Sequence, residues 1–155
     1  INLTRWRQGL VVRPGNPLDI LTPADVARAG LRVALRDDAS AAHKLLMELL
    51  HRERVDDVVL AGPHATGHAE VAQLVRAGAA DVGVAIESVA LASGLDFVPL
   101  SEERFDLVVA AAVAELPPVS RLIQALDDPG FRTEMAHLPG YDAAIAGHVT
   151  TVEAA

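Results

Sequence analysis

The sequence contains no cysteine and few aromatic residues. The first absence excludes disulfide bonds, thiolate metal sites and cysteine nucleophiles, and it suits a reducing compartment, so we expect a cytoplasmic protein. Aromatic residues make up 3% of the chain while hydrophobic residues make up 51%, so the core must consist of Ala, Val and Leu. Such residues pack well between parallel strands and covering helices. The length of 155 residues predicts one domain over residues 1–155.

The sequence also lacks a basic cluster and a long apolar run. Its 13 Lys and Arg residues against 21 Asp and Glu residues give a formal charge of −8. A nucleic-acid-binding surface needs a basic patch, and Arg5 and Arg7 beside Trp6 are too few, so we expect no direct nucleic-acid contact. The longest apolar run, Leu107–Ala114, is far shorter than the roughly 18 residues of a membrane-spanning helix. No signal peptide is visible, and we expect no membrane contact.

Strand and helix patterns alternate along the chain. Strands are expected at Gly9–Arg13, Leu31–Leu35, Val58–Ala61, Val82–Ile86, Phe97–Leu100 and Phe105–Ala110. Helices are expected from Pro23, with Thr22 as N-cap, and over residues 40–53, 67–77, 87–93, 117–126 and 131–137. This order predicts an α/β fold of right-handed strand–helix–strand units around a mostly parallel sheet flanked by helices.

Ligands of such sheets bind beyond the carboxyl ends of the strands, where the helices begin. Three strand-to-helix loops are therefore the places to search. They cover residues 36–40, 62–68 and 86–88.

Several stretches of the sequence, taken in order, resemble a known family. They are Arg7-Gln8-Gly9-Leu10-Val11-Val12 with Gly15-Asn16-Pro17, Gly78-Ala79-Ala80-Asp81-Val82-Gly83, Gly94-Leu95-Asp96-Phe97-Val98-Pro99-Leu100, Glu103, Phe105-Asp106-Leu107 and Gly140-Tyr141-Asp142. Over most of residues 5–147 the chain is similar to the type 2 periplasmic-binding-protein-like domain of the cytoplasm. That domain is related to periplasmic molybdate- and tungstate-binding proteins and is found attached to winged-helix regulators or molybdopterin-biosynthesis proteins.

The resemblance implies a lobe core at about residues 28–100, crossover strands at about 7–13 and 105–112, and C-terminal helices over 117–138. Family members carry a further segment before the Arg7-Gln8-Gly9 stretch, which builds most of their first lobe, so we expect that lobe to be truncated here. The family's Gly-Ser-Gly-Thr-Arg loop is replaced by Ala39-Ser40-Ala41-Ala42-His43, in which only the serine is kept.

The candidate ligand site lies at two helix starts that we expect to converge. A helix start offers unpaired backbone N–H groups and a partial positive charge, which suit an oxyanion. The candidate ligand-binding residues are Arg36, Ser40, Ala41, Thr66, Gly67 and His68, with Ala41 and Gly67 acting through their amides. In the plainer alternative, Ser40 and Thr66 cap their helices, and Arg36 and His68 lie in solvent.

We expect no catalytic residue, no metal and no cofactor. His64 and His68 have the spacing of two metal ligands on a helix, but Pro63 and Gly67 predict a loop there, and no third ligand is evident. The acidic pair Glu102-Glu103 is typical of a solvated surface. The sequence has no nucleophile elbow, phosphate loop or dinucleotide-binding motif.

Three further residues favour structural roles. Asp81 precedes a strand and is expected to cap or pair in a turn, whereas Asp106 interrupts an apolar strand and needs a partner if it is buried. Trp6, the only tryptophan, is expected to anchor the N-terminal strand or to mark a surface that pairs with another chain.

The sequence thus predicts a non-catalytic binding or sensing domain for a small anion of the molybdate or tungstate class, read by a fused or partner transcription regulator. The alternative is an interaction module that binds no small molecule and forms a homodimer, which covers apolar surface. An enzyme of unknown reaction is a third interpretation.

Overall fold

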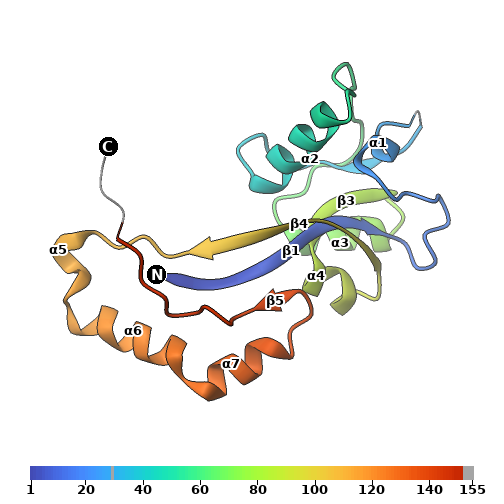
Figure 1. The fold of residues 1–155 in the computed structure, drawn as a ribbon. Coiled ribbons are helices and arrows are strands. Elements are labelled where there is room, and N and C mark those ends of the chain that lie inside the picture. The colour runs from blue at the N-terminus through green and yellow to red at the C-terminus, as the bar shows by residue number, and fades with distance from the viewer. Residues whose placement is uncertain (29, 152–155) are drawn as a thin grey trace. The chain divides into compact units, whose positions relative to one another are not determined.

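The computed structural model describes residues 1–28 and 30–151, which divide into two compact units. Unit 1 contains Ile1–Trp6 and the chain from Glu102 onward, and unit 2 contains Arg7–Ser101. Two long strands, β1 (Asn2–Val12) and β4 (Asp96–Asp106), each contribute residues to both units (Figure 1). Each unit is described in turn.

Unit 2 is built on a mixed sheet. Its strands follow the order β2-β3-β1-β4, where β2 is Val33–Ala34 and β3 is Val82–Ile86. β2 runs parallel to β3, but β1 runs antiparallel to it and pairs Gln8 with Ile86. The predicted mostly parallel sheet is therefore wrong. The reason is that β1 enters the sheet beside the last residue of β3 and runs back along it in the opposite direction. Only the β2–β3 pair therefore has the strand–helix–strand geometry.

Helices cover both faces of this sheet. Leu10 and Val84 point to one face and belong to a core cluster with the buried side of α2, whereas Val11 and Ala85 point to the opposite face, where they pack with α3. In Figure 1, α1 and α2 lie above the sheet of unit 2, and α3 and α4 lie below it. The covering helices are α1 (Pro23–Val26), α2 (Ala41–Arg52), α3 (His68–Arg76) and α4 (Glu87–Ala92).

The helix starts agree with the sequence analysis. Thr22 caps α1 by accepting a hydrogen bond from the Asp25 amide, and the Asp25 carboxylate accepts one from the Thr22 amide in return. The bonds that the Asp25 carboxylate accepts from the amides of Leu21 and Thr22 lower its pKa. α2 begins directly after its N-cap, Ser40. The predicted helices over residues 40–53, 67–77 and 87–93 are therefore confirmed, with ends shifted by a residue or so.

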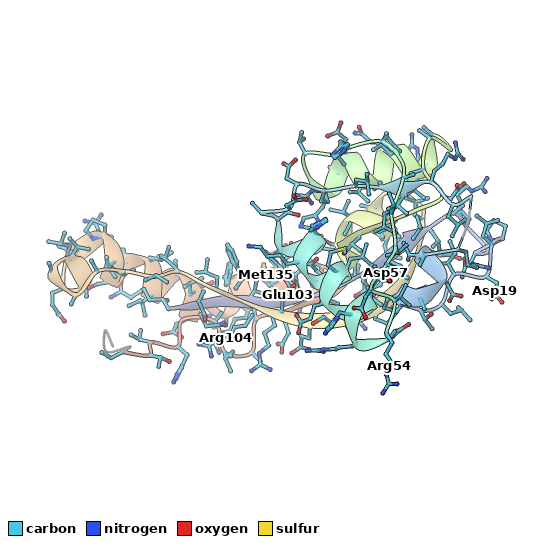
Figure 2. The ribbon with its side chains drawn as sticks, turned by 90° about the horizontal axis from the view of Figure 1, so that it is seen from above. Asp19, Arg54, Asp57, Glu103, Arg104 and Met135 are labelled. Carbon is cyan, nitrogen blue, oxygen red and sulfur yellow. The ribbon has the colours of Figure 1, made fainter. Side chains whose placement is uncertain are left out.

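The end of α2 carries an uncommon backbone conformation. Glu53 is the C-cap, and Arg54 follows with a φ of 62°, in the left-handed region that favours glycine. Arg54 is exposed, and its side chain points away from the body of unit 2 (Figure 2).

Two predicted strands have different boundaries. Val58–Ala61 is not a strand, since only Ala61 forms an isolated bridge, to Arg32, and Val59 is 92% exposed. The next residue, Gly62, packs closely against Val33: a Cβ atom at Gly62 would lie 2.1 Å from the carbonyl oxygen of Val33. The predicted strands at residues 97–100 and 105–110 are instead one continuous strand, β4, which ends at Asp106.

Unit 1 combines the outer ends of β1 and β4 with a short strand and three helices. β5 (Tyr141–Asp142) pairs antiparallel with β1. The helices are α5 (Ala111–Ala114), α6 (Pro117–Asp127) and α7 (Pro129–Ala136). α6 and α7 were predicted, although α7 begins earlier than expected because Asp128 caps it through the Phe131 amide. α5 and β5 were not predicted. The buried core of this unit is small and comprises Leu126, Ala143 and Ala146.

Trp6 anchors β1 within unit 1. Its ring stacks on Phe105 at a centroid distance of 4.8 Å and meets Tyr141 edge-on at 6.0 Å. Its indole N–H donates to Glu103 at 3.3 Å. Three of the five aromatic residues therefore meet in one cluster, in line with the anchoring role expected for Trp6.

Asp106 is exposed, and it has partners although the sequence called for one only if it were buried. Its carboxylate accepts a hydrogen bond of 2.9 Å from the side-chain amide of Asn2 and another from Arg104. The bond from Asn2, followed by those from Arg104, holds the pKa of Asp106 below its usual range.

No helix in the described part of the chain is long and apolar enough to cross a membrane.

Candidate functional site

Two of the three loops singled out from the sequence lie side by side at the end of β2. The Leu35 carbonyl accepts a hydrogen bond of 2.8 Å from the Ala65 amide, which joins the two loops through their backbones. One step further, Arg36 Nη2 donates to the carbonyl oxygen of Thr66 at 3.3 Å. The loop before α2 and the loop before α3 are therefore neighbours, as the sequence analysis expected.

The third loop, at the start of α4, brings in residues that the sequence analysis did not select. Because Gln8 pairs with Ile86, β1 places Arg7 and Gln8 at the edge where β3 ends. The Arg7 guanidinium lies 2.6 Å from the Glu87 carboxylate, and Gln8 is only 1% exposed. The signal that would have found them is the Arg7-Gln8-Gly9 stretch, which belonged to the family resemblance and was not read as part of the site.

Ser40 caps α2, as its plainer interpretation expected. Its Oγ accepts a hydrogen bond of 3.1 Å from the His43 amide. This bond uses an oxygen lone pair and leaves the hydroxyl proton available for donation, so the cap does not prevent a ligand contact. The neighbouring Ala41 amide, the first of α2, makes no hydrogen bond among the described residues.

Thr66 is fully engaged by a residue that was not predicted. Its amide donates to Glu70 Oε2 at 2.7 Å, and its hydroxyl donates to the same oxygen at 2.8 Å. These two bonds, together with the positive charge of Arg36, lower the pKa of Glu70. Glu70 lies in the first turn of α3, whose N-cap is Gly67, and it stabilises that helix start. Thr66 offers no free donor in this arrangement.

Arg36 has hydrogen-bond donors that no described residue of unit 2 accepts. One guanidinium nitrogen, Nη2, reaches the Thr66 carbonyl. The other two, Nε and Nη1, are buried and have no hydrogen-bond partner among the described residues. A buried charged donor without an acceptor is costly, and such groups usually mark a missing partner such as a water or an ion.

Arg36 lines a small pocket beneath the start of α2. The remaining lining is His43 and the apolar residues Val33, Ala34, Leu35, Ala42, Leu46, Leu60 and Val84. Its volume is about 10 Å³, which is room for about one water molecule. A tetrahedral oxyanion is too large for this volume, and Arg36 is the one candidate ligand-binding residue in the lining.

The remaining candidates lie at the helix starts that follow these two loops. His68 is the first residue of α3 and is half-buried, and the Gly67 amide makes no hydrogen bond among the described residues. His43 lies 3.6 Å from the exposed carboxylate of Asp38. Within the described ranges, no three side chains of the metal-ligating types come together, His64 and His68 included.

Comparison with known proteins identifies a matching family. The model of a family described as the PBP superfamily domain, where PBP stands for periplasmic binding protein, matches residues 1–127. A Bacillus subtilis (strain 168) protein, the uncharacterized YvgK, is 33% identical over 151 residues. That match takes in 96% of this chain but 48% of YvgK, so the chain spans about half the length of this relative.

Two solved structures show the same fold. An ancestral amino acid-binding protein, a precursor of cyclohexadienyl dehydratase, superposes with a TM-score of 0.63 at 19% identity, over 86% of this chain and 58% of its own. A histidine kinase sensor domain similar to periplasmic binding proteins superposes with a TM-score of 0.57 at 16% identity, over 91% of this chain and 62% of its own. The shared fold is an α/β fold with a mixed sheet. The proteins that carry it here are binding or sensing proteins, although one is the precursor of an enzyme.

Proposed function

Because the chain belongs to the PBP superfamily domain family, we propose that it is a binding domain that recognises a small anion without transforming it. The observation that carries this proposal is the guanidinium of Arg36, whose buried Nε and Nη1 have no acceptor among the described residues. An anion is the partner that satisfies such donors best, because a hydrogen bond between charged groups is about twice as strong as one between neutral groups.

The groups around Arg36 suit the same ligand. The Ser40 hydroxyl and the Ala41 amide stand at the start of α2, and Gly67 and His68 stand at the start of α3. In our proposal, Arg36 supplies the charge, Ser40 and His68 donate from their side chains, and the amides of Ala41 and Gly67 complete the set. Thr66 joins them when it is released from Glu70.

Molybdate and tungstate are the first ligands to test, because the sequence resembles domains related to proteins that bind them. Both are doubly charged tetrahedral oxyanions, which suits a guanidinium with two nitrogens that lack an acceptor among the described residues. The solved relative that binds amino acids suggests a carboxylate as the competing ligand class. Sulfate and phosphate serve as matched oxyanions of smaller size.

We further propose a sensing role for the bound state. The fold is shared with a histidine kinase sensor domain, in keeping with a domain whose ligand is reported to a regulator. Binding would shift the population of conformations, and a fused or partner regulator in the cytoplasm would read that shift.

Thermal unfolding in the presence of each anion tests the proposal. We expect molybdate or tungstate to raise the melting temperature saturably, because a ligand at a hundred times its Kd adds about 2.7 kcal/mol of stability. Arg36→Gln should abolish the response. Arg54→Gln removes the same charge from an exposed position and should respond as the parent does. A parent protein that no anion stabilises, or an Arg36→Gln variant that responds fully, contradicts the proposal.

A second candidate function rests on a different observation. Unit 1 exposes a series of large apolar side chains, namely Phe105 (44%), Leu107 (37%), Val108 (87%), Val113 (40%) and Leu116 (49%). Large apolar side chains left exposed close together in the sequence suggest a protein interface, and a homodimer is the arrangement to test. Sedimentation analysis should then show a concentration-dependent dimer that Val108→Lys dissociates, and a monomer at all concentrations excludes this function.

A further inference from the structure

No described strand pairs with the outer edge of β4 in unit 1. The sheet ends with β4, and within this unit β1 lies between β4 and β5 (Figure 1). Leu107, directly after β4, turns its backbone to β1: its amide donates to the Ile1 carbonyl at 2.8 Å, and its carbonyl accepts from the Ile1 nitrogen at 2.9 Å. Successive residues of a strand direct their backbone groups to opposite sides, so those of Asp106 and Arg104 point away from β1. Such an edge is a template for pairing with another chain.

The side chains along this edge are complementary to themselves. Phe105 stands between two opposite charges, Arg104 and Asp106, which form an ion pair of 2.8 Å within the chain. In an antiparallel pair of two copies with Phe105 opposite the partner's Phe105, Arg104 lies opposite the partner's Asp106, and Asp106 opposite the partner's Arg104. A pair centred on Arg104, Asp106 or Glu103 places two like charges opposite each other, which is destabilising. The charges therefore select the register centred on Phe105.

Phe105 suits the centre of such a pair. Its ring stacks on Trp6 at a centroid distance of 4.8 Å, yet the residue remains 44% exposed. In this register Arg104 and Asp106 exchange backbone hydrogen bonds with the partner, and Phe105 occupies the position between them, where opposite side chains lie closest. Two phenyl rings at that position bury part of each other's exposed surface, and aromatic pairs directly opposite each other stabilise a sheet.

We propose that two copies of this chain pair antiparallel through the outer edges of their β4 strands, centred on Phe105, so that the sheet of one unit 1 continues into that of the other. This inference rests on the second candidate function, the homodimer, and adds the strand that forms it and the register. The paired segment covers residues 103–107 of each copy. Val108 and the exposed apolar residues after it flank that segment.

Charge reversal on each side of Phe105 tests the register. Arg104→Glu places a carboxylate opposite the partner's Asp106 at two symmetric positions, and Asp106→Arg likewise places two guanidinium groups opposite each other. Each variant alone should weaken the dimer by about tenfold to hundredfold, because attractive cross-strand pairs become repulsive. In an equimolar mixture, the introduced glutamate of one variant faces the introduced arginine of the other, so we expect the mixture to form a heterodimer as tightly as the parent forms its homodimer.

Sedimentation equilibrium of the parent, the two variants and their mixture measures these dissociation constants. The matched control is Arg121→Glu at an exposed position of α6, which changes the net charge as Arg104→Glu does and should dimerise like the parent. Asp106 also accepts a hydrogen bond from Asn2. Melting temperatures therefore verify that each variant is folded.

A cysteine at the proposed centre gives a second measurement that does not depend on charge. Phe105→Cys introduces the only thiol, because the sequence contains no cysteine, so a disulfide can form only between two copies. Opposite Cα atoms at this position lie about 4.5 Å apart, within the range of a disulfide. Leu107→Cys is the control, since Leu107 faces the partner's Glu103 in this register. Under mild oxidation Phe105→Cys should cross-link faster than Leu107→Cys on a non-reducing gel.

The outcomes distinguish the inference from the function on which it rests. If the parent dimerises but either charge variant dimerises as tightly, or if the mixture dimerises no better than its components, the strand pairing is wrong while the homodimer stands. Cross-linking of Leu107→Cys as fast as that of Phe105→Cys also contradicts the register. If the parent is a monomer at all concentrations, the second candidate function fails, and the strand pairing fails with it.

Discussion

The carboxylate of Asp81 accepts three hydrogen bonds from Arg32, one from its backbone amide at 2.9 Å and two from its guanidinium at 3.1 and 2.9 Å. Asp81 is 8% exposed and stands directly before β3, whereas Arg32 stands directly before β2. The pair therefore fixes the starts of the two parallel strands relative to each other. This is the pairing role in a turn that the sequence predicted for Asp81.

Asp81→Asn should destabilise the protein by about 1–2 kcal/mol. The substitution removes the charge that three donors share, and it turns an amide group toward the guanidinium. The estimate is modest because the Arg32 side chain is 52% exposed and solvent screens it. Urea unfolding followed by circular dichroism measures the change. Asp57→Asn, at an exposed position, should change stability by less than about 0.5 kcal/mol.

Acid should remove the contribution of Asp81. Arg32, first through its side-chain hydrogen bonds, lowers the pKa of Asp81 below its ordinary value of 3.8. Between the folded and unfolded pKa values the unfolded state binds more protons, so stability rises with pH there. The contribution is complete well above 3.8 and is lost as the pH falls through the folded pKa. The difference in unfolding free energy between parent and Asp81→Asn should therefore shrink from pH 6 to about pH 3. A constant difference contradicts this assignment.

Ser40 should show two separable roles. Ser40→Ala removes the cap of α2 and should cost about 1 kcal/mol of stability. Ser40→Asp restores a side-chain acceptor for the His43 amide and should recover most of that stability. Both variants should lose the proposed oxyanion response, since alanine donates nothing and aspartate repels the ligand. Chemical unfolding and anion titration of the same samples test the pair, and an anion response retained by Ser40→Asp removes Ser40 from the site.

Arg54→Gly should stabilise the protein by roughly 0.5–1 kcal/mol. Arg54 follows the C-cap of α2 with a φ of 62°, a conformation that costs a side-chain-bearing residue more than it costs glycine. The gain is partly offset because glycine makes the unfolded chain more flexible. Arg54→Ala is the matched control, since it removes the same charge but keeps the Cβ atom, and it should bring no comparable gain. Thermal and urea unfolding measure the change in stability. An Arg54→Gly variant no more stable than the parent contradicts this prediction.

The sequence predicted the local elements of unit 2 well, because their signals are local. The cap at Ser40, the apolar period along α2 and the β-rich run at Val82–Ile86 all depend on neighbouring residues. The direction of β1 relative to β3 depends on pairing between distant segments, and no local pattern contains it. The predicted strand at residues 58–61 failed for the same reason, because pairing needs a distant partner and only Ala61 forms a bridge, to Arg32.

The sequence predicted the location of the candidate site more accurately than the hydrogen bonds within it. Adjacent strand-to-helix loops follow from the topology of parallel strands, and the contact between Arg36 and Thr66 agrees with that expectation. Glu70 was missed because it lies four residues after Thr66, whereas the familiar capping pattern has a spacing of three. Side-chain geometry decides which acceptor pairs with which donor. The spacing of residues in the sequence is only a weak guide to that geometry.

The only tryptophan, Trp6, lies in unit 1, stacked on Phe105, while unit 2 contains none. Intrinsic fluorescence excited at the indole therefore observes one half of the molecule, and far-ultraviolet dichroism observes both. Superimposable melting curves from the two signals would mean that the halves lose structure as one cooperative body. Curves that separate would mean that no single melting temperature describes this protein, and each half would then need its own thermodynamic description.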